Sequence, residues 1–185
     1  MFIHFLEEAE MVFCLKKMFK EKKFVLLSIF LIYFSVTIHS QNALNLLVGF
    51  GEGNIIDKPS KSYFSIELRK PFCFKNFSLS ANFIIEGNRD DNYAGLGISF
   101  QKKLSQKFIV SLTTGFGRFS DEYFKLGSKI EFRSGIDLFY ILTEKLYFVF
   151  SFYHYSNGGI SNYNPGTESI VARIAIPLSG KFQNR

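Results

Sequence analysis

The amino-acid sequence predicts an all-β chain: an eight-stranded antiparallel transmembrane β-barrel of the outer membrane. Three observations lead to this fold class. Apolar and polar residues alternate with a period of two along most of the chain after residue 43. The alternating stretches are about ten residues long, which suits strands that cross a bilayer. The connections alternate between long polar loops and short turns, as in barrels with external loops and periplasmic turns.

The alternation divides the chain into eight expected strands, and the longer connections between them are rich in Gly, Asn and Asp. In order they are ALNLLVGFGE (43–52), SYFSIELRKP (62–71), FSLSANFIIEG (77–87), YAGLGISFQK (93–102), KFIVSLTTGFGRF (107–119), LGSKIEFRSGIDLFYI (126–141), KLYFVFSFYHYS (145–156) and ESIVARIAIPL (168–178). The odd-numbered connections, such as GEGNIIDKPSK and NGGISNYNPGT, are long. The even-numbered ones, PFCFKN, KLSQ and LTE, are short.

The two faces of these strands differ in chemistry. In the first, second and sixth expected strands the even-numbered positions are mainly apolar, whereas the odd-numbered ones carry charges that could pair across an interior, Glu67 with Arg69 and Glu131 with Arg133. A barrel closes every strand edge, which hydrocarbon requires, and eight strands leave an interior filled by side chains rather than a pore. The alternative is a secreted soluble sandwich or lipocalin-like barrel with its apolar face inside.

An export signal precedes the expected barrel. From Met18 a lysine-rich segment leads into an apolar run over 24–38, followed by small and polar residues, which predicts a signal peptide cleaved after Ser40. An uncleaved anchor is less favoured, because about 15 apolar residues are short for a helical span of roughly 20. We expect residues 1–40 to be removed and residues 41–185 to form the barrel.

Composition excludes several classes of protein. The chain is 47% hydrophobic and 18% aromatic, with 24 Phe, no Trp and 21% charged residues, unlike disordered or collagen-like chains. Its net charge of +6 is not gathered into a nucleic-acid patch. Loss of Cys14 with the signal would leave Cys73 alone, so no internal disulfide is expected. Residues 1–17 fit neither signal nor fold, so translation could start at Met1, Met11 or Met18.

The last hairpin carries the candidate site. His154, Ser156 and Glu168 all have even parity, so the strand pattern puts them on the lipid-facing side. Ionisable groups there are costly unless they serve one another. A carboxylate that orients an imidazole, which in turn activates a serine, is the arrangement of a hydrolytic triad. Asn157 and the Gly158-Gly159 backbone could donate hydrogen bonds to an oxyanion. The alternative is an ordinary polar hairpin loop.

The pattern His-x-Ser-Asn-x-Gly, followed by Asn-x-Gly-x-Glu-Ser, resembles the lipid A 3-O-deacylase (PagL) family. Its residues in this chain are His154, Ser156, Asn157, Gly159, Asn164, Gly166, Glu168 and Ser169. The resemblance implies an esterase that removes the 3-linked primary acyl chain of lipid A. Ser156 would be the nucleophile, His154 the base, and Glu168 the residue that orients His154. Asn157 and Gly159 would form the oxyanion hole. Gly158 and the tail after Phe182 depart from the family pattern.

The resemblance also sets expectations about partners and cofactors. The enzyme would need no cofactor or metal, would act on lipid A or lipopolysaccharide among outer-membrane lipids, and would not bind nucleic acid. A homodimer and cleavage of phospholipid esters are open alternatives. A second class of function is a non-enzymatic barrel, adhesin-like or envelope-binding, in which the last loop only binds surface ligands.

Overall fold

The computed structural model describes residues 43–56, 59–74, 77–120 and 125–178, all within the segment expected to form the barrel. The predictions for the signal peptide and for Phe182 lie outside the described residues. In the described part of the chain, no helix is long and apolar enough to span a membrane.

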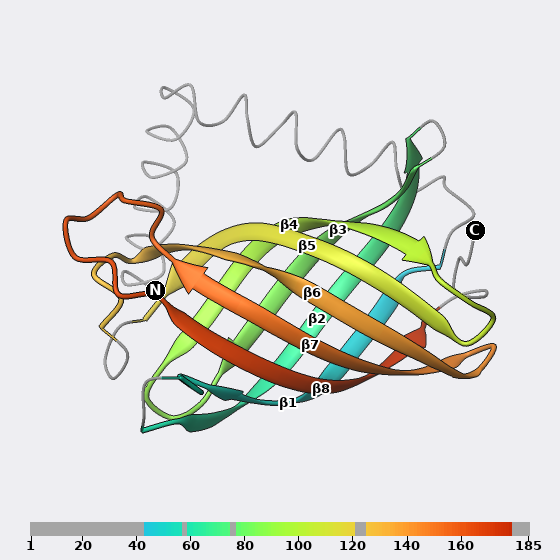
Figure 1. Ribbon diagram of the computed structural model, residues 1–185, viewed down its shortest axis with the longest axis horizontal. Coiled ribbons are helices and arrows are strands. Elements are labelled where there is room, and N and C mark those ends of the chain that lie inside the picture. The colour runs from blue at the N-terminus through green and yellow to red at the C-terminus, as the bar shows by residue number, and fades with distance from the viewer. Residues whose placement is uncertain (1–42, 57–58, 75–76, 121–124, 179–185) are drawn as a thin grey trace, which may run out of the picture. The chain divides into compact units, whose positions relative to one another are not determined.

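The described residues form a closed barrel of eight antiparallel strands (Figure 1). Each strand pairs with the next one along the chain, and the first strand pairs with the last. The strands are β1 (Asn45–Gly53), β2 (Lys61–Phe74), β3 (Phe77–Gly87), β4 (Asn92–Lys103), β5 (Phe108–Phe119), β6 (Ile130–Thr143), β7 (Leu146–Ser156) and β8 (Thr167–Pro177). Closure removes the free edges that an open sheet would expose. The predicted fold class is confirmed.

The predicted strand bounds agree with the structure most closely at β3, whose range is identical. The largest difference is at β6, which was expected from residue 126 but begins at Ile130. Gly127 has a φ of 89°, a left-handed conformation that does not continue a strand. Leu126 is buried beneath this turn. Alternation across residues 126–129 therefore mimicked strand periodicity in what is a packed loop.

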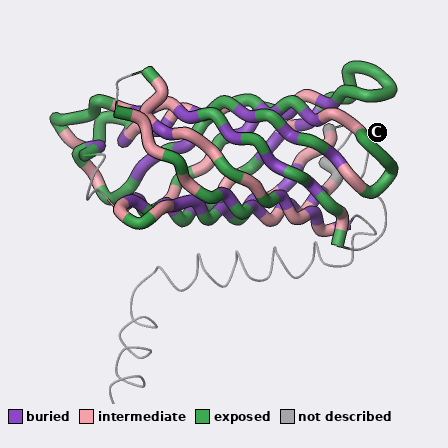
Figure 2. Tube along the Cα trace, turned by 90° about the horizontal axis from the view of Figure 1, so that it is seen from below, coloured by how far each residue is buried: buried purple, intermediate pink, exposed green. Residues whose placement is uncertain are grey.

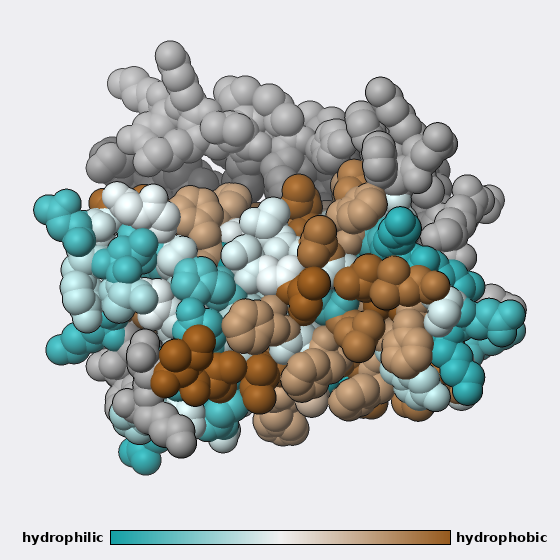
Figure 3. Space-filling model, viewed as in Figure 1, coloured by the Kyte–Doolittle hydropathy of each residue, from teal (hydrophilic) through white to brown (hydrophobic). Residues whose placement is uncertain are grey.

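Burial alternates along every strand whose burial pattern is complete, as Figure 2 shows along the trace. Along β7, for example, Tyr147, Val149, Ser151 and Tyr153 are buried, whereas Phe148, Phe150 and Phe152 are exposed. Apolar side chains gather over the middle of the visible face of the barrel, with hydrophilic ones toward its two ends (Figure 3). An apolar band between polar ends is the surface expected of a barrel in a bilayer.

The inward face is packed, and it combines a network of charged side chains with two clusters of buried apolar ones. Arg69, Arg133 and Arg173 are among the largest fully buried side chains. Arg69 Nε lies 2.6 Å from Glu67 Oε1, and Arg69 Nη2 lies 2.8 Å from the Asp137 carboxylate. Arg173 Nη1 donates to Glu67 at 2.6 Å. Buried charges persist when paired and hydrogen-bonded in this way.

One of the two predicted interior ion pairs is confirmed and the other is wrong. Glu67 does pair with Arg69. Glu131 does not pair with Arg133, which instead reaches Glu86 at 3.2 Å and Glu67 at 3.5 Å. Both Glu131 carboxylate oxygens are buried without a hydrogen-bond partner among the described residues. Residues two apart on a strand share a face, which is why Glu131 was expected to pair with Arg133. In the closed barrel the carboxylates of Glu67 on β2 and Glu86 on β3 also face the interior, and Arg133 pairs with these.

Candidate active site

The pairing of β7 with β8 brings the predicted histidine and glutamate together. His154 and Glu168 are direct cross-strand partners. His154 Nδ1 lies 3.0 Å from Glu168 Oε1, a hydrogen bond. The His154 side chain is 43% exposed and that of Glu168 20% exposed. The pair is therefore accessible from outside the barrel, on the face that carries the phenylalanines.

Ser156 continues the same outward face, two residues after His154 at the end of β7. It is half-buried and lies opposite Phe132 of β6. In this structure its hydroxyl makes no hydrogen bond to His154, although both residues are described. Nucleophile and base are often farther apart in free enzymes than in complexes with substrate. The structure thus brings two of the three predicted residues into contact and puts the third on the same face.

Asn157, the first residue of the β7–β8 loop, is fully buried and anchors the loop. Its Nδ2 donates to Leu126 O at 3.0 Å and to Tyr163 O at 2.9 Å. Its backbone N–H donates to Asn164 Oδ1 at 3.0 Å. The Gly159 N–H donates to Asn157 Oδ1, also at 3.0 Å. The N–H groups assigned to an oxyanion hole therefore donate to other acceptors in this structure, within the β7–β8 loop and at Leu126.

Two glycines of the loop pack closely against the β6–β7 wall, and the contact of Gly166 with His154 is a feature that the sequence did not reveal. Gly166 has a φ of 69°, and a Cβ there would lie 2.8 Å from His154 Cε1. Gly158 has a φ of 62°, and a Cβ there would lie 2.9 Å from the Phe132 ring. The Asn-Pro-Gly triplet signals a turn, but no local signal says that Gly166 lies against the His154 ring.

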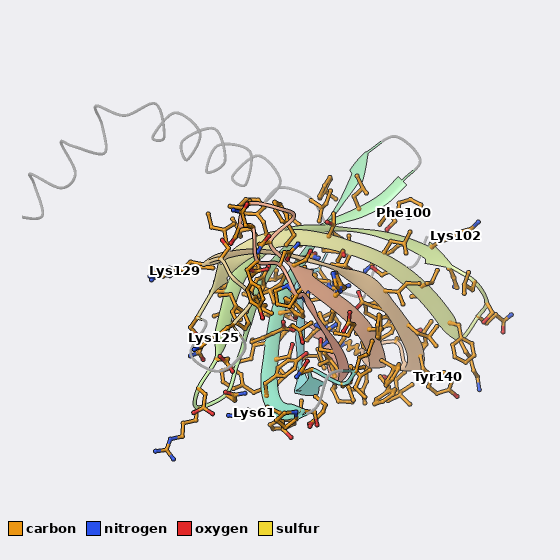
Figure 4. The ribbon with its side chains drawn as sticks, turned by 60° about the vertical axis from the view of Figure 1, so that its left-hand side comes forward. Lys61, Phe100, Lys102, Lys125, Lys129 and Tyr140 are labelled. Atoms are coloured by element: carbon orange, nitrogen blue, oxygen red, sulfur yellow. The ribbon has the colours of Figure 1, made fainter. Side chains whose placement is uncertain are left out.

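The described residues contain no group of three or more His, Cys, Asp or Glu that could hold a metal ion. Basic and acidic side chains both lie near the loop end of the barrel, the acidic ones including Glu52, Asp90 and Asp91. Figure 4 shows Lys61, Lys125 and Lys129 toward one end of the barrel, with Lys102 and Tyr140 toward the other. Lys61 forms an ion pair with Asp90, whereas Lys125 and Lys129 are exposed.

Comparisons with solved structures agree on the barrel. The chain is similar to the crystal structure of the outer membrane enzyme PagL, with a TM-score of 0.57 and 16% identity, over 72% of this chain and 99% of that one. It is also similar to Neisserial surface protein A (NspA), with a TM-score of 0.51 and 12% identity, over 75% of this chain and 98% of that one. A de novo designed transmembrane β-barrel is similar with a TM-score of 0.50 and 14% identity, over 74% of this chain and 96% of that one. At these identities the likeness establishes the outer-membrane barrel fold alone.

No curated protein matches the chain. A family model does: that of lipid A 3-O-deacylase (PagL) matches residues 74–177, more than half of the chain. The matched range includes His154, Ser156 and Glu168, and it confirms the resemblance drawn from the last hairpin. This chain belongs to the lipid A 3-O-deacylase (PagL) family.

Proposed function

We propose that the protein is an outer-membrane serine esterase that hydrolyses the 3-linked primary acyl ester of lipid A. The observation that carries the proposal is the 3.0 Å hydrogen bond between His154 and Glu168 on the outward wall, with Ser156 on the same face. Family membership supports the substrate class. A membrane lipid could reach this wall laterally, without entering the filled interior.

In the proposed reaction, Glu168 accepts the Nδ1 hydrogen of His154 and so keeps Nε2 unprotonated. Nε2 takes the proton of the Ser156 hydroxyl as its Oγ attacks the ester carbonyl carbon. The tetrahedral intermediate collapses, the bond from the carbonyl carbon to the sugar oxygen breaks, and His154 returns the proton to that oxygen. In the second half-reaction water attacks the acyl-serine carbonyl carbon while His154 takes its proton. The bond from that carbon to Ser156 Oγ breaks, His154 returns the proton to Oγ, and the fatty acid is released.

The oxyanion hole assigned to Asn157 and Gly159 stays a prediction. A substrate oxygen would have to replace Asn164 Oδ1 at the Asn157 N–H, or Asn157 Oδ1 at the Gly159 N–H. Such an exchange keeps each donor satisfied, so its cost is a rearrangement of the loop rather than a lost hydrogen bond. Positioning of Ser156 against His154 would accompany the same rearrangement.

The test uses the full chain in outer membranes that contain lipopolysaccharide, with mass spectrometry of lipid A. Wild type should remove one primary acyl chain. Ser156→Ala and His154→Asn should lower the rate by about 10³-fold or more, because the members of a triad act as a unit. Ser169→Ala is the matched control: Ser169 is adjacent to Glu168 but faces the interior, so this variant should keep its activity.

Two results would contradict the proposal. Unchanged lipid A masses in cells that produce a folded wild-type barrel would favour a non-enzymatic binding protein. Full activity in folded Ser156→Ala would mean that another group is the nucleophile.

A further inference from the structure

The outward face of the barrel is mainly apolar, and the polar side chains that interrupt it away from the strand ends include Lys70 on β2. Among the described residues, a row of four polar side chains also interrupts this face: Thr114 on β5, Ser134 on β6, His154 on β7 and Glu168 on β8. We call these four residues the polar row. Only His154 and Glu168 have a role in the proposed reaction, so Thr114 and Ser134 need a separate account.

The polar row is continuous because its members are direct cross-strand partners. Thr114 pairs with Ser134, Ser134 with His154, and His154 with Glu168. Side chains opposite each other on adjacent strands have Cβ atoms about 4.5–5.5 Å apart. The next residues of the same face are apolar on both sides of Ser134, namely Phe132 and Ile136. Ser134 therefore lies beside the catalytic histidine in a narrow polar strip.

The polar row also descends from the loop end of the barrel into the apolar band. Glu168 is the second residue of β8 (Thr167–Pro177), and His154 lies two residues before the end of β7 (Leu146–Ser156). Ser134 lies four residues inside β6 (Ile130–Thr143), and Thr114 five residues inside β5 (Phe108–Phe119). Because the strands of a barrel are tilted, a row of cross-strand partners moves along the barrel axis from one strand to the next.

Ser134 and Thr114 are both exposed, and neither hydroxyl has a hydrogen-bond partner in the described residues. A hydroxyl in hydrocarbon without a partner is unfavourable. The hydrocarbon of acyl tails contains no group that could form a hydrogen bond with such a hydroxyl. The ester, amide and hydroxyl oxygens of a glycolipid could, and they are concentrated where the chains leave the sugar.

We propose that Ser134 and Thr114 bind the substrate and determine specificity, by hydrogen bonding to the carbonyl and hydroxyl oxygens that flank the scissile ester of an acylated glycolipid. This inference rests on the proposed function, because it takes His154 as the base that faces the ester. The polar row then receives the hydrogen-bonding groups of the substrate, while the flanking apolar side chains contact its tails.

The experiment compares two substrates in the same detergent: lipid A, and a fatty-acid p-nitrophenyl ester that has no further carbonyl or hydroxyl group. Ser134→Ala and Thr114→Val should each raise KM for lipid A about three- to tenfold, the effect of one lost neutral hydrogen bond. The ratio of kcat/KM on lipid A to kcat/KM on the simple ester should fall by a similar factor. Ser62→Ala is the matched control, since Ser62 is an exposed serine at the loop end of β2, outside the polar row.

Three outcomes of this experiment would overturn the inference. An unchanged KM for lipid A in both folded variants would mean that the two hydroxyls do not contact substrate. An equal loss on both substrates would mean that Ser134 acts through His154 rather than on the lipid. A wild-type protein that does not deacylate lipid A would refute the proposed function itself, and this inference with it.

Discussion

His154 is held from two sides. Glu168 accepts its hydrogen bond at 3.0 Å, and the Gly166 backbone, in a left-handed conformation, lies against the ring edge that carries Cε1 and Nε2. Glycine is favoured at Gly166 both because positive φ is strained for other residues and because a side chain would take the space of the ring. The position of the imidazole thus depends on a residue that does no chemistry.

Gly166→Ala should therefore reduce deacylation about tenfold or more while the barrel still folds, because the new Cβ displaces His154 from Glu168. Initial rates on lipid A in detergent provide the measurement. Wild-type rates in a folded Gly166→Ala barrel would contradict this role of the glycine.

At the scale of elements, the β7–β8 loop is tied to the β5–β6 loop. Asn157 bridges Leu126 O and Tyr163 O, and a Cβ on Gly127 would lie 2.0 Å from the Tyr163 carbonyl oxygen, so the two backbones are in close contact. Asn157 connects segments 31 residues apart in sequence. The loop that follows Ser156 is for this reason a packed structure rather than a free connection.

Asn157→Asp should loosen the loop, because it removes both Nδ2 donors and puts carboxylate oxygens near two carbonyl oxygens. Leaving buried acceptors unpaired costs about 1–3 kcal/mol each. Limited proteolysis should detect faster cleavage within residues 157–166. In Asn164→Ala the loop keeps both Nδ2 bonds of Asn157 and should be cleaved more slowly than in Asn157→Asp. Cleavage of Asn157→Asp at the wild-type rate would show that Asn157 is not the anchor.

At the scale of the whole molecule, the interior is connected by one network of ions. Asp137 on β6 accepts hydrogen bonds from Arg69 at 2.8 Å, from Thr113 at 2.9 Å and from Arg173 at 3.0 Å. These partners come from β2, β5 and β8, and the Tyr153 hydroxyl on β7 also donates to Asp137, so one carboxylate joins five strands. This network adds to the two buried apolar clusters of the interior in holding the strands together.

Asp137→Ala should destabilise the barrel by about 3–5 kcal/mol, the usual cost of breaking a buried ion pair from one side. The midpoint of denaturant unfolding in detergent, followed by the change in gel mobility between folded and unfolded barrel, measures this loss. The matched change is Glu131→Gln on the same strand, whose carboxylate has no hydrogen-bond partner among the described residues. We expect Glu131→Gln to unfold at the wild-type midpoint or above it, and equal destabilisation by the two changes would contradict a role for the network.

Much of the fold follows from local pattern, because a period of two in polarity is a property of each strand by itself. That the side chains of His154, Ser156 and Glu168 face outward was predictable in this way. The closed barrel was predictable from the number of strands, because a strand edge in hydrocarbon must not stay unpaired. The start of β6 was not predictable, because the Leu126–Gly127 turn is set by its contact with the β7–β8 loop.

By itself the sequence determined which side of each strand a residue occupies, and only the tertiary structure decided what it meets there. Cross-strand register is the sum of many pairings and of the loop geometry, which no short stretch encodes. It puts Glu168 opposite His154, assigns Arg133 to Glu86 instead of Glu131, and aligns Thr114 and Ser134 with the site.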